Sequence, residues 1–417
     1  MMPKLVAQML NVGLRLTALA AKLGLMLYLG RYFSLSDMGI YGLVLGASMF
    51  LSWVLGMKID YMVSREIVGL DPVSAACKMR DQAVFYTLNY LALAVVALAA
   101  GLSGMFPVDG KIIFFITALS VAEGYAGMTY TNMNSLGQPL QAKFLFFIRA
   151  GLWVFPVALL GLLFPAWRHI DVVLGLWLLG VLASLVATTW VWRHMPWRAT
   201  YNTPIDWTWL RQNVKQCLFI WLGTIGIAGG TYVDRFIVAH YLTLDYAGIA
   251  TFYASFAAAL LTLSQSGVLA FSYPRMIKLH RDGDEAGFRI EARQTLWHVA
   301  LFAAAVSIVV GIGVPVLAQF LDRPKLAAES FTLWLMLFAV WLRSNAETLY
   351  YILYARHQDK PLWLGSLLFL IPALGSNLLL VPPLGLSGMG YSMILAAAFM
   401  FFWRLWYVVR GNVQQSL

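Results

Sequence analysis

The chain has 417 residues, of which 61% are hydrophobic and only 12% are charged, and its mean hydropathy is +0.74. Soluble globular domains carry about 25% charged residues, so this composition excludes a soluble protein and makes lipid the solvent of most of the surface. The formal net charge of +10 comes from basic residues scattered over short connectors. That scatter excludes a nucleic-acid-binding face, and no nucleic-acid partner is expected.

Long apolar runs follow one another along the chain and predict an all-α polytopic membrane protein. A β-barrel would show short segments of alternating hydrophobicity instead. Twelve runs are long enough for a span of about 20 residues. Their predicted positions are 9–30, 38–57, 84–103, 112–131, 144–164, 171–192, 216–238, 248–271, 296–320, 329–354, 362–381 and 386–409.

The basic residues predict how the spans are oriented. Lys and Arg are concentrated in three polar connectors, 58–82, 193–215 and 273–294. All three lie on the same side in a twelve-span arrangement, and the positive-inside rule makes that side cytoplasmic. Both termini are therefore expected in the cytoplasm. Cys77 and Cys217 adjoin these connectors, so no structural disulfide is expected.

Sequence motifs for catalysis are absent, and the chain is predicted not to be an enzyme. No Gly-rich phosphate-binding loop occurs, and the six histidines show no metal-ligand spacing with Cys or Glu. The connectors are too short to fold into a catalytic domain. We therefore expect no cofactor and no metal.

Two nine-residue stretches, one in each half of the chain, share a Tyr, a Leu and a Gly in register. RYFSLSDMG runs from Arg31 to Gly39, and HYLTLDYAG runs from His240 to Gly248, an offset of 209 residues (240 minus 31). The first lies between spans 1 and 2 and the second between spans 7 and 8. This placement predicts two pseudo-symmetric six-helix lobes, 1–205 and 206–417, related by a parallel repeat.

Charged residues inside the spans mark candidate functional positions, because each costs at least about 2.5–3.5 kcal/mol to insert. In span 1, Gln8, Asn11, Arg15 and Lys22 fall on one side of a helix at about 100° per residue. Lys22 is near the middle of the span and is predicted to line a cavity, with a structural ion pair as the alternative. Arg15 either lines the same cavity or reaches the cytoplasmic surface.

Two further spans carry charges of both signs. Asp234 and Arg235 are neighbours in span 7, where Arg235 is expected to reach outward while Asp234 pairs with another helix. Arg343 and Glu347 are four residues apart in span 10 and are expected to neutralise one another.

Span 4 carries an isolated acid, Glu123. It is expected to be protonated or to meet a partner on another helix, and a coupling-ion site is the alternative. Arg149 and Arg404 lie near cytoplasmic helix ends and are expected to anchor them. The intramembrane charges favour cations overall, so a basic cavity would attract an anion, and phosphate is the natural one.

Four stretches resemble Wzx-type polysaccharide flippases. The run from 27 to 67 has the Arg-Tyr turn, the acidic residue, a Gly-x-Tyr-Gly and an aspartate before a charged connector. YVDRFIVAHYLTLDYAGIATFYAS (232–255) is similar to the seventh span and turn of that family. YPRMIKLHRDGD (273–284) resembles its connector after span 8, and PPLGLSGMGYSMILA (382–396) its Gly-rich entry to the last span.

The resemblance implies the multidrug/oligosaccharidyl-lipid/polysaccharide export superfamily, with two six-helix lobes around a central cavity. Wzx-type members move undecaprenyl-pyrophosphate-linked oligosaccharides from the cytoplasmic to the periplasmic leaflet of the bacterial inner membrane. A polysaccharide polymerase and a chain-length regulator are the implied protein partners. Twelve spans depart from the fourteen of lipid II flippases. Multidrug exporters of the same fold remain an alternative, and an intramembrane glycan polymerase or ligase is a further one.

The predicted site has an anion-binding and an ion-coupling part. The residues that would bind the pyrophosphate are Arg15, Lys22, Arg31, Arg149 and Arg235. The acids that would take H⁺ or Na⁺ are Glu123, Asp234 and Glu347.

Overall fold

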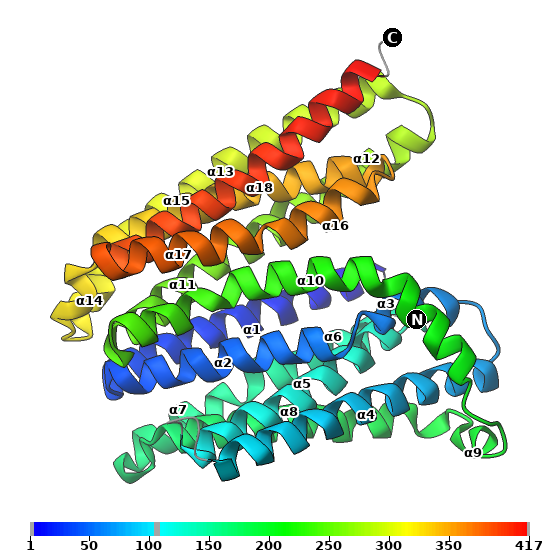
Figure 1. Ribbon diagram of the computed structural model, residues 1–417, viewed down its shortest axis with the longest axis horizontal. Coiled ribbons are helices and arrows are strands. Elements are labelled where there is room, and N and C mark those ends of the chain that lie inside the picture. The colour runs from blue at the N-terminus through cyan, green and yellow to red at the C-terminus, as the bar shows by residue number, and fades with distance from the viewer. Residues whose placement is uncertain (1–3, 104–108, 415–417) are drawn as a thin grey trace. The chain divides into compact units, whose positions relative to one another are not determined.

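The computed structural model describes the backbone of residues 4–103 and 109–414 and the side chains of residues 13–103 and 109–410. Within these ranges every regular element is a helix (Figure 1), so the predicted all-α class is confirmed. The helices are α1 (Lys4–Tyr32), α2 (Leu35–Leu55), α3 (Ile59–Glu66), α4 (Pro72–Ser103), α5 (Gly110–Ser135), α6 (Pro139–Phe147), η1 (Ile148–Leu152), α7 (Val154–Leu163), η2 (Pro165–Trp167), α8 (Ile170–Val191), η3 (Trp192–His194), α9 (Trp197–Thr200), α10 (Trp207–Tyr241), α11 (Leu244–Ser264), η4 (Gln265–Leu269), α12 (Ala270–Arg281), α13 (Glu285–Phe320), α14 (Pro324–Ala328), α15 (Ser330–Ala355), α16 (Asp359–Leu368), α17 (Leu370–Leu384) and α18 (Leu386–Gln414).

Eleven helical segments of the described chain are long and apolar enough to cross a membrane. They coincide with eleven of the twelve predicted spans. The twelfth prediction, 329–354, falls on α15, which has 26 residues but carries the polar run from Arg343 to Glu347 in its middle. The count of twelve and the cytoplasmic termini therefore stay predictions.

The three polar connectors are largely helical, which corrects their description as connectors. They hold α3, α9, α12 and the first turns of α4, α10 and α13. An aspartate caps each long helix: Asp71 Oδ1 accepts from the Ser74 amide at 3.0 Å, Asp206 Oδ1 from Trp209 at 2.8 Å, and Asp284 Oδ1 from Gly287 at 2.8 Å. Such caps satisfy backbone donors beyond the apolar region, so hydropathy alone places these helix starts too late.

The chain forms two compact units. Unit 1 comprises Met1–Tyr28 and Val44–Trp221, and unit 2 comprises Leu29–Leu43 and Leu222–Leu417. The turn between α1 and α2 thus belongs to unit 2, although most of α1 belongs to unit 1. The lobe boundary predicted between 205 and 206 stays a prediction.

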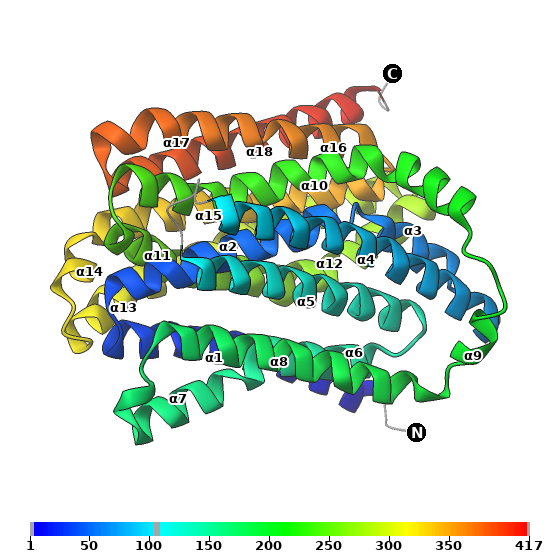
Figure 2. The same cartoon turned by 60° about the horizontal axis from the view of Figure 1, so that its bottom comes forward.

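Helix α5 is central to unit 1, where it packs on α3, α4, α6 and α8 (Figures 1 and 2). Tyr86 and Tyr90 of α4 lie in one buried cluster with Met128 of α5. The Tyr90 ring reaches the α5 backbone at Gly124, where a Cβ would overlap its hydroxyl. The absence of a side chain at this glycine therefore sets the close approach of α4 to α5.

Helix α15 is central to unit 2, where it packs on α11, α13 and α18. Buried Ala346 of α15 joins a cluster with Phe369, Ala396 and Met400. The Trp341 indole of α15 donates to the Ala300 carbonyl of α13 at 2.9 Å. Fourteen residues of α15 are buried, which makes it the best covered helix of this unit apart from α11, and this burial compensates for its polar middle.

The glycines of α10 serve close packing. A Cβ at Gly226 would overlap the Ser366 carbonyl of α16, and one at Gly230 would overlap the Phe369 ring. The helix itself continues without a break from Trp207 to Tyr241.

The repeated stretches begin their second helices in similar ways. In the first copy, Ser34 Oγ accepts from the Asp37 amide at 3.0 Å and Asp37 Oδ2 accepts from the Ser34 amide at 3.2 Å, a reciprocal capping box. In the second copy, Thr243 Oγ1 accepts from the Tyr246 amide at 3.4 Å. The shared spacing of a hydroxyl residue before each helix explains the recurrence in the sequence.

Within unit 2, the two copies of the repeat touch one another through their glycines. A Cβ at Gly39 would overlap the Leu244 carbonyl oxygen, and a Cβ at Gly248 would overlap the Leu35 carbonyl oxygen. The contact is reciprocal, as in a two-fold helix crossing built on small residues. A Cβ at Gly42, one turn further along α2, would overlap the Thr251 hydroxyl of α11.

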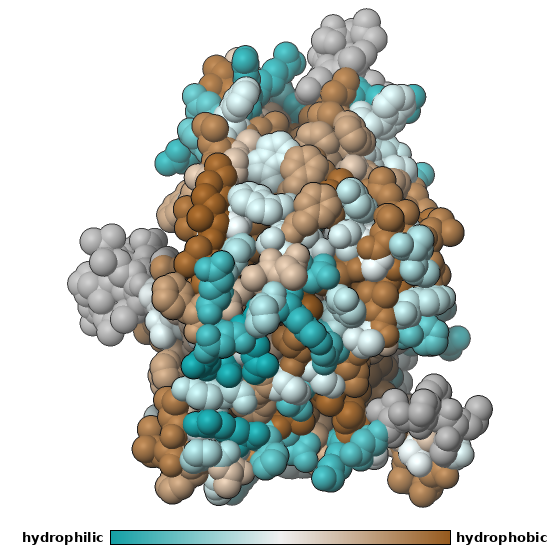
Figure 3. Space-filling view, turned by 90° about the vertical axis from the view of Figure 1, so that its left-hand side faces the viewer, coloured by the Kyte–Doolittle hydropathy of each residue, from teal (hydrophilic) through white to brown (hydrophobic). Residues whose placement is uncertain are grey.

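Ionic contacts reinforce this crossing from α14 and the residues before it. Arg31 pairs with Asp322, and Lys325 Nζ lies 3.1 Å from Asp245 Oδ2. Arg323 Nε donates to the Gly30 carbonyl at 2.8 Å. Figure 3 views the end of the molecule that holds α14, and hydrophilic side chains gather there.

Candidate functional site

A cluster of charged side chains lies among the apolar helices of unit 1. It brings together Glu123 of α5, Arg149 of η1 and Trp177 of α8, and Lys22 of α1 interacts electrostatically with both Glu123 and Arg149. Two of the predicted anion-binding residues and one predicted acid therefore meet in one place.

Both carboxylate oxygens of Glu123 have partners. Arg149 Nη1 lies 3.4 Å from Oε2, and the Trp177 indole donates to Oε1 at 3.0 Å. Arg149 Nη1 also donates to the Glu123 backbone carbonyl at 3.4 Å. Of the two expectations for this acid, the partner on another helix is confirmed.

Arg149 owes its position to an irregular helix. The segment from Ile148 to Leu152 is a π-helix, a form that is rare and frequently marks functional sites. Its Gly151 lies against the Ala18 backbone of α1, where a Cβ would come within 3.0 Å of the Ala18 Cα. The Arg149 side chain is only 16% exposed, so its expected role as a surface anchor is wrong.

Two tryptophans line up behind the cluster. The rings of Trp153 and Trp177 stack with centroids 6.0 Å apart and an interplanar angle of 15°. The Trp153 side chain fits because Gly180 of α8 has no Cβ. The role of Trp177 was missed in the sequence. Tryptophan prefers the ends of membrane spans, so a tryptophan inside a span, such as Trp177, could have been identified as a residue with a specific partner.

Lys22 is the cation of this cluster that stays accessible. Its side chain is exposed, and among the described residues no carboxylate lies within 4 Å of its ammonium group. The expectation of a tight structural ion pair for Lys22 is therefore not met. Arg15 lies on the same side of α1 and is half-buried. The side chains of Gln8 and Asn11, which complete the predicted polar stripe, lie outside the described residues.

Arg31 and Arg235, the other two predicted anion ligands, belong to unit 2. Arg31 is exposed and engaged with Asp322. Arg235 is only 7% exposed, so its expected outward orientation is wrong. Its guanidinium lies 5.5 Å from the Tyr232 ring centroid, and its Nε and Nη1 are buried without a hydrogen-bond partner in the described structure.

Asp234 is also buried, at 5% exposure. Its Oδ1 accepts from the backbone amide of Arg235 at 2.7 Å. This local hydrogen bond takes the place of the interhelical ion pair expected from the sequence, since no cationic side chain of the described chain lies within 4 Å of this carboxylate.

A second buried charge cluster lies in unit 2. Arg404 of α18 donates to the Ala346 carbonyl at 2.8 Å and lies 3.4 Å from Glu347 Oε1. Arg343 instead contacts Thr231 at 3.5 Å and the Phe369 ring, with its guanidinium carbon 5.0 Å from the centroid. Arg343 and Glu347 form no salt bridge within 4 Å in the described structure, although their charges interact electrostatically, so the expected neutralisation occurs only at longer range. The anchoring role expected of Arg404 is also wrong, because Arg404 is only 2% exposed.

Within the described residues, no group of three or more His, Cys, Asp or Glu side chains is arranged to hold a metal ion. The unit 1 cluster has an excess of positive charge. It holds two cations, Lys22 and Arg149, against one carboxylate, and one of the cations is exposed. A partly apolar setting strengthens the attraction between such a site and an anion.

No protein-family model and no curated protein sequence matches the chain. Solved structures do match over nearly its whole length. An inward-facing multidrug resistance MATE family transporter of the MOP superfamily has 12% sequence identity and a TM-score of 0.76, covering 96% of this chain and 95% of the other. The chain has a MATE-like fold.

Two further structures with this MATE-like fold extend the comparison. The lipid II flippase MurJ, in an inward closed conformation, has 13% identity and a TM-score of 0.78 and covers 96% of this chain and 87% of the other. A MOP superfamily transporter from Pyrococcus furiosus, described by the reverse polarity of its binding pocket, has 12% identity and a TM-score of 0.58, covering 97% and 94%. The predicted MOP-like architecture of a multi-pass membrane protein is thereby confirmed.

Proposed function

We propose that the chain is a flippase that moves undecaprenyl-pyrophosphate-linked oligosaccharide from the cytoplasmic to the periplasmic leaflet of the bacterial inner membrane. The single observation that carries the proposal is the exposed Lys22 residue near Arg149, in a cluster where two cations face one carboxylate. A multidrug exporter for cations would be expected to present carboxylates there. The fold, shared with a lipid II flippase, supports a lipid-linked substrate.

The proposed mechanism separates the substrate into two parts. The polyprenyl tail stays in the bilayer, while the pyrophosphate and sugars cross along the polar face of α1. Lys22 binds the pyrophosphate as a mobile point charge, and Arg149 is held by Glu123 so that its remaining donors face a fixed direction. Arg15 extends the same face toward the start of the span. A polymerase and a chain-length regulator would receive the flipped unit.

The test uses a strain whose surface polysaccharide depends on this protein. Lys22→Ala, alone and combined with Arg15→Ala, should abolish surface polymer and leave lipid-linked repeat units in the cytoplasmic leaflet. Lys22→Arg is the matched control and should retain more polymer than Lys22→Ala. Normal surface polymer in the double variant at equal protein level would refute the proposal.

A second candidate function, cation-coupled multidrug export, is favoured by the similarity to MATE transporters and by the buried carboxylate of Asp234. In that case H⁺ or Na⁺ would bind Glu123, Asp234 or Glu347 in the coupling step. Asp234→Asn would then abolish drug export while Lys22→Ala leaves it intact. The flippase predicts the opposite order of sensitivity.

A further inference from the structure

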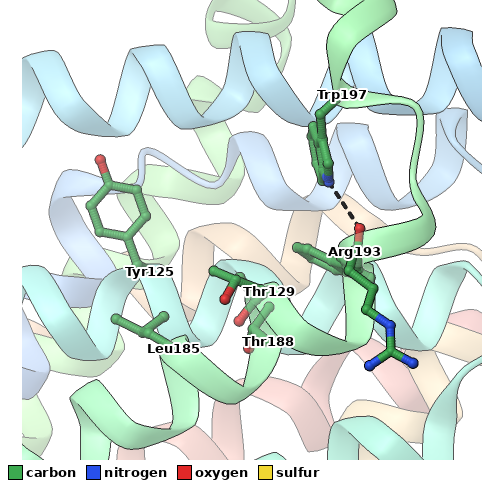
Figure 4. A pocket seen from close by; sticks show the side chains of 8 residues that line it. Tyr125, Thr129, Leu185, Thr188, Arg193 and Trp197 are labelled. Atoms are coloured by element: carbon green, nitrogen blue, oxygen red, sulfur yellow. Dashed lines mark hydrogen bonds between the residues drawn. The ribbon is translucent and has the colours of Figure 1, made fainter.

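A pocket of about 440 Å³ lies in unit 1, lined by residues of α5, α8, η3 and α9 (Figure 4). Its volume lies within the range of about 300–1,000 Å³ that is usual for ligand pockets. It sits where α5 and α8 end and where α9 begins. The lining residues are Tyr125, Thr129, Leu185, Thr188, Thr189, Trp192, Arg193 and Trp197.

The polar groups of the pocket wall are already engaged. The hydroxyls of Thr129, Thr188 and Thr189 donate to carbonyls of their own helices at 2.7–3.1 Å. The Trp197 indole donates to the Trp192 carbonyl at 3.0 Å, as Figure 4 shows. The wall therefore offers methyl groups and aromatic faces to an occupant. A sugar would leave its hydroxyls unpaired there, which makes the pocket unsuited to glycans.

The two remaining wall aromatics are engaged in the same way. The Trp192 indole donates to Gln138 Oε1 at 3.3 Å, and the Tyr125 hydroxyl shares a hydrogen bond with Thr87. Neither side chain needs an occupant to satisfy it. The wall therefore suits an apolar ligand better than a polar one.

The roof of the pocket is fixed by ionic and hydrogen-bonded contacts. Arg80 of α4 pairs with the buried Asp81 at 2.6 Å and donates to the carbonyl of Thr200, the last residue of α9, and to that of Thr203 beyond it. Asp81 Oδ2 also accepts from the Asp206 amide at 3.2 Å. These contacts hold the segment that carries Trp197, so the pocket exists before any ligand enters.

Positive charge lies at the rim and hydrocarbon outside it. The Arg193 guanidinium is exposed and points away from Tyr125 and Leu185 in Figure 4, and its carbon lies 4.3 Å from the Trp190 ring centroid. Arg198 of α9 is also exposed. Exposed Leu182, Val186 and Trp190 follow the outer side of α8. Arginine and tryptophan together at a helix end are typical of the membrane interface.

We infer that this pocket binds an acyl chain of an anionic phospholipid, whose phosphate meets Arg193 at the rim. The apolar wall accounts for the chain, and charge complementarity accounts for the headgroup. Anionic lipids gain about 1 kcal/mol for each Lys or Arg near the membrane surface. The lipid is a resident of unit 1, and this inference does not depend on the proposed transport function.

The test is photo-labelling of the purified full-length chain with phosphatidylglycerol that carries a diazirine in one acyl chain. The label should map to the peptide that spans Leu185 to Trp197. Leu185→Trp fills the pocket and should remove most of this labelling. Val186→Trp is the matched control, because it adds the same indole one position away on the outer side of α8 and should leave labelling intact.

The headgroup is tested with the same probe on phosphatidylcholine. Wild-type chain should prefer phosphatidylglycerol, and Arg193→Gln should reduce that preference about fivefold. Thr189→Phe, at an exposed wall position, replaces Leu185→Trp if the latter does not fold. The inference would be overturned if neither Leu185→Trp nor Thr189→Phe changed the labelling. Equal labelling by phosphatidylglycerol and phosphatidylcholine would also overturn it. Displacement by polyprenyl phosphate at concentrations where phosphatidylglycerol does not compete would also overturn it.

Discussion

The two buried charge clusters use similar side chains for different purposes. In unit 1, Glu123 is occupied by Arg149 and Trp177, and Lys22 is left exposed. In unit 2, Arg404 is buried and joins α18 to α15 through both Glu347 and a backbone carbonyl. A buried charge whose partners are all fixed holds helices together, whereas an exposed charge beside a fixed pair is available to a ligand. The comparison thus predicts stability effects for unit 2 and transport effects for unit 1.

The largest effect is expected at the unit 2 pair. Arg404→Met leaves Glu347 and the Ala346 carbonyl buried without their donor, which should cost about 3–5 kcal/mol of unfolding free energy. A thermal melt in detergent measures it. Adding Glu347→Leu to Arg404→Met should recover much of the loss, because the unpaired carboxylate is then gone. If Arg404→Met alone melted at the same temperature as the wild type, the structural role of this cluster would be contradicted.

A smaller loss of stability is expected at the crossing of the two repeats. Gly39→Ala places a methyl group against the Leu244 carbonyl, so the helices must separate, at a cost of about 1–3 kcal/mol. Gly127→Ala is the matched control in α5, where no atom lies within 4 Å of the added methyl. The control should be neutral or stabilising, since alanine favours a helix by about 0.5–1 kcal/mol over glycine. Equal melts for the two variants would show that the crossing is loose.

In unit 1, Glu123→Gln tests whether Glu123 only holds Arg149 in position or also binds a coupling ion. The single amide oxygen can accept from Trp177 or from the Arg149 side chain but not from both, because the two donors meet different carboxylate oxygens, so the loss of stability should be about 1–3 kcal/mol. Surface polymer should persist within a few-fold of wild type, because Lys22 is unaffected. Loss of all polymer at normal protein level would instead identify Glu123 as the ion-coupling acid. It would contradict a purely structural role for Glu123.

The smallest effect is expected at Asp71, outside both clusters. Its hydrogen bonds from Ser74 and Val73 lower the pKa of this carboxyl below its ordinary value of 3.8. A lowered folded-state pKa means that the stabilisation is present above pH 3.8 and is lost as the pH falls through the folded-state pKa. Melts of wild type and Asp71→Ala should therefore differ at pH 7 and converge only at acidic pH, below the folded-state pKa and hence below 3.8. Asp71→Asn keeps an oxygen that can cap the helix but has no carboxyl group to titrate. Its melt should therefore differ from that of Asp71→Ala by the same amount at both pH values.

The sequence predicted the membrane class, the order of the helices and the repeat, because hydropathy and local spacing determine them. Lys22 is exposed, and the cavity predicted for it stays a prediction. The sequence did not predict which residues pair. Glu347 was assigned to Arg343 in its own helix, whereas its salt bridge is made with Arg404 of α18, 57 residues along the chain. Partners from distant helices depend on tertiary packing, and the π-helix at Arg149 has no periodic signal.

The membership of the first turn in unit 2 bears on how the protein can be divided. Leu29–Leu43 supplies Gly39 and the carbonyl groups that α11 and Arg323 contact, yet it lies far upstream of the rest of that unit. A fragment that starts at residue 206 would lack the segment Leu29–Leu43. The surface of α11 around Gly248, which contacts that segment, would then be exposed. Coexpressed halves should therefore assemble only when the upstream fragment retains its first two helices, which makes split-gene complementation depend on that early segment.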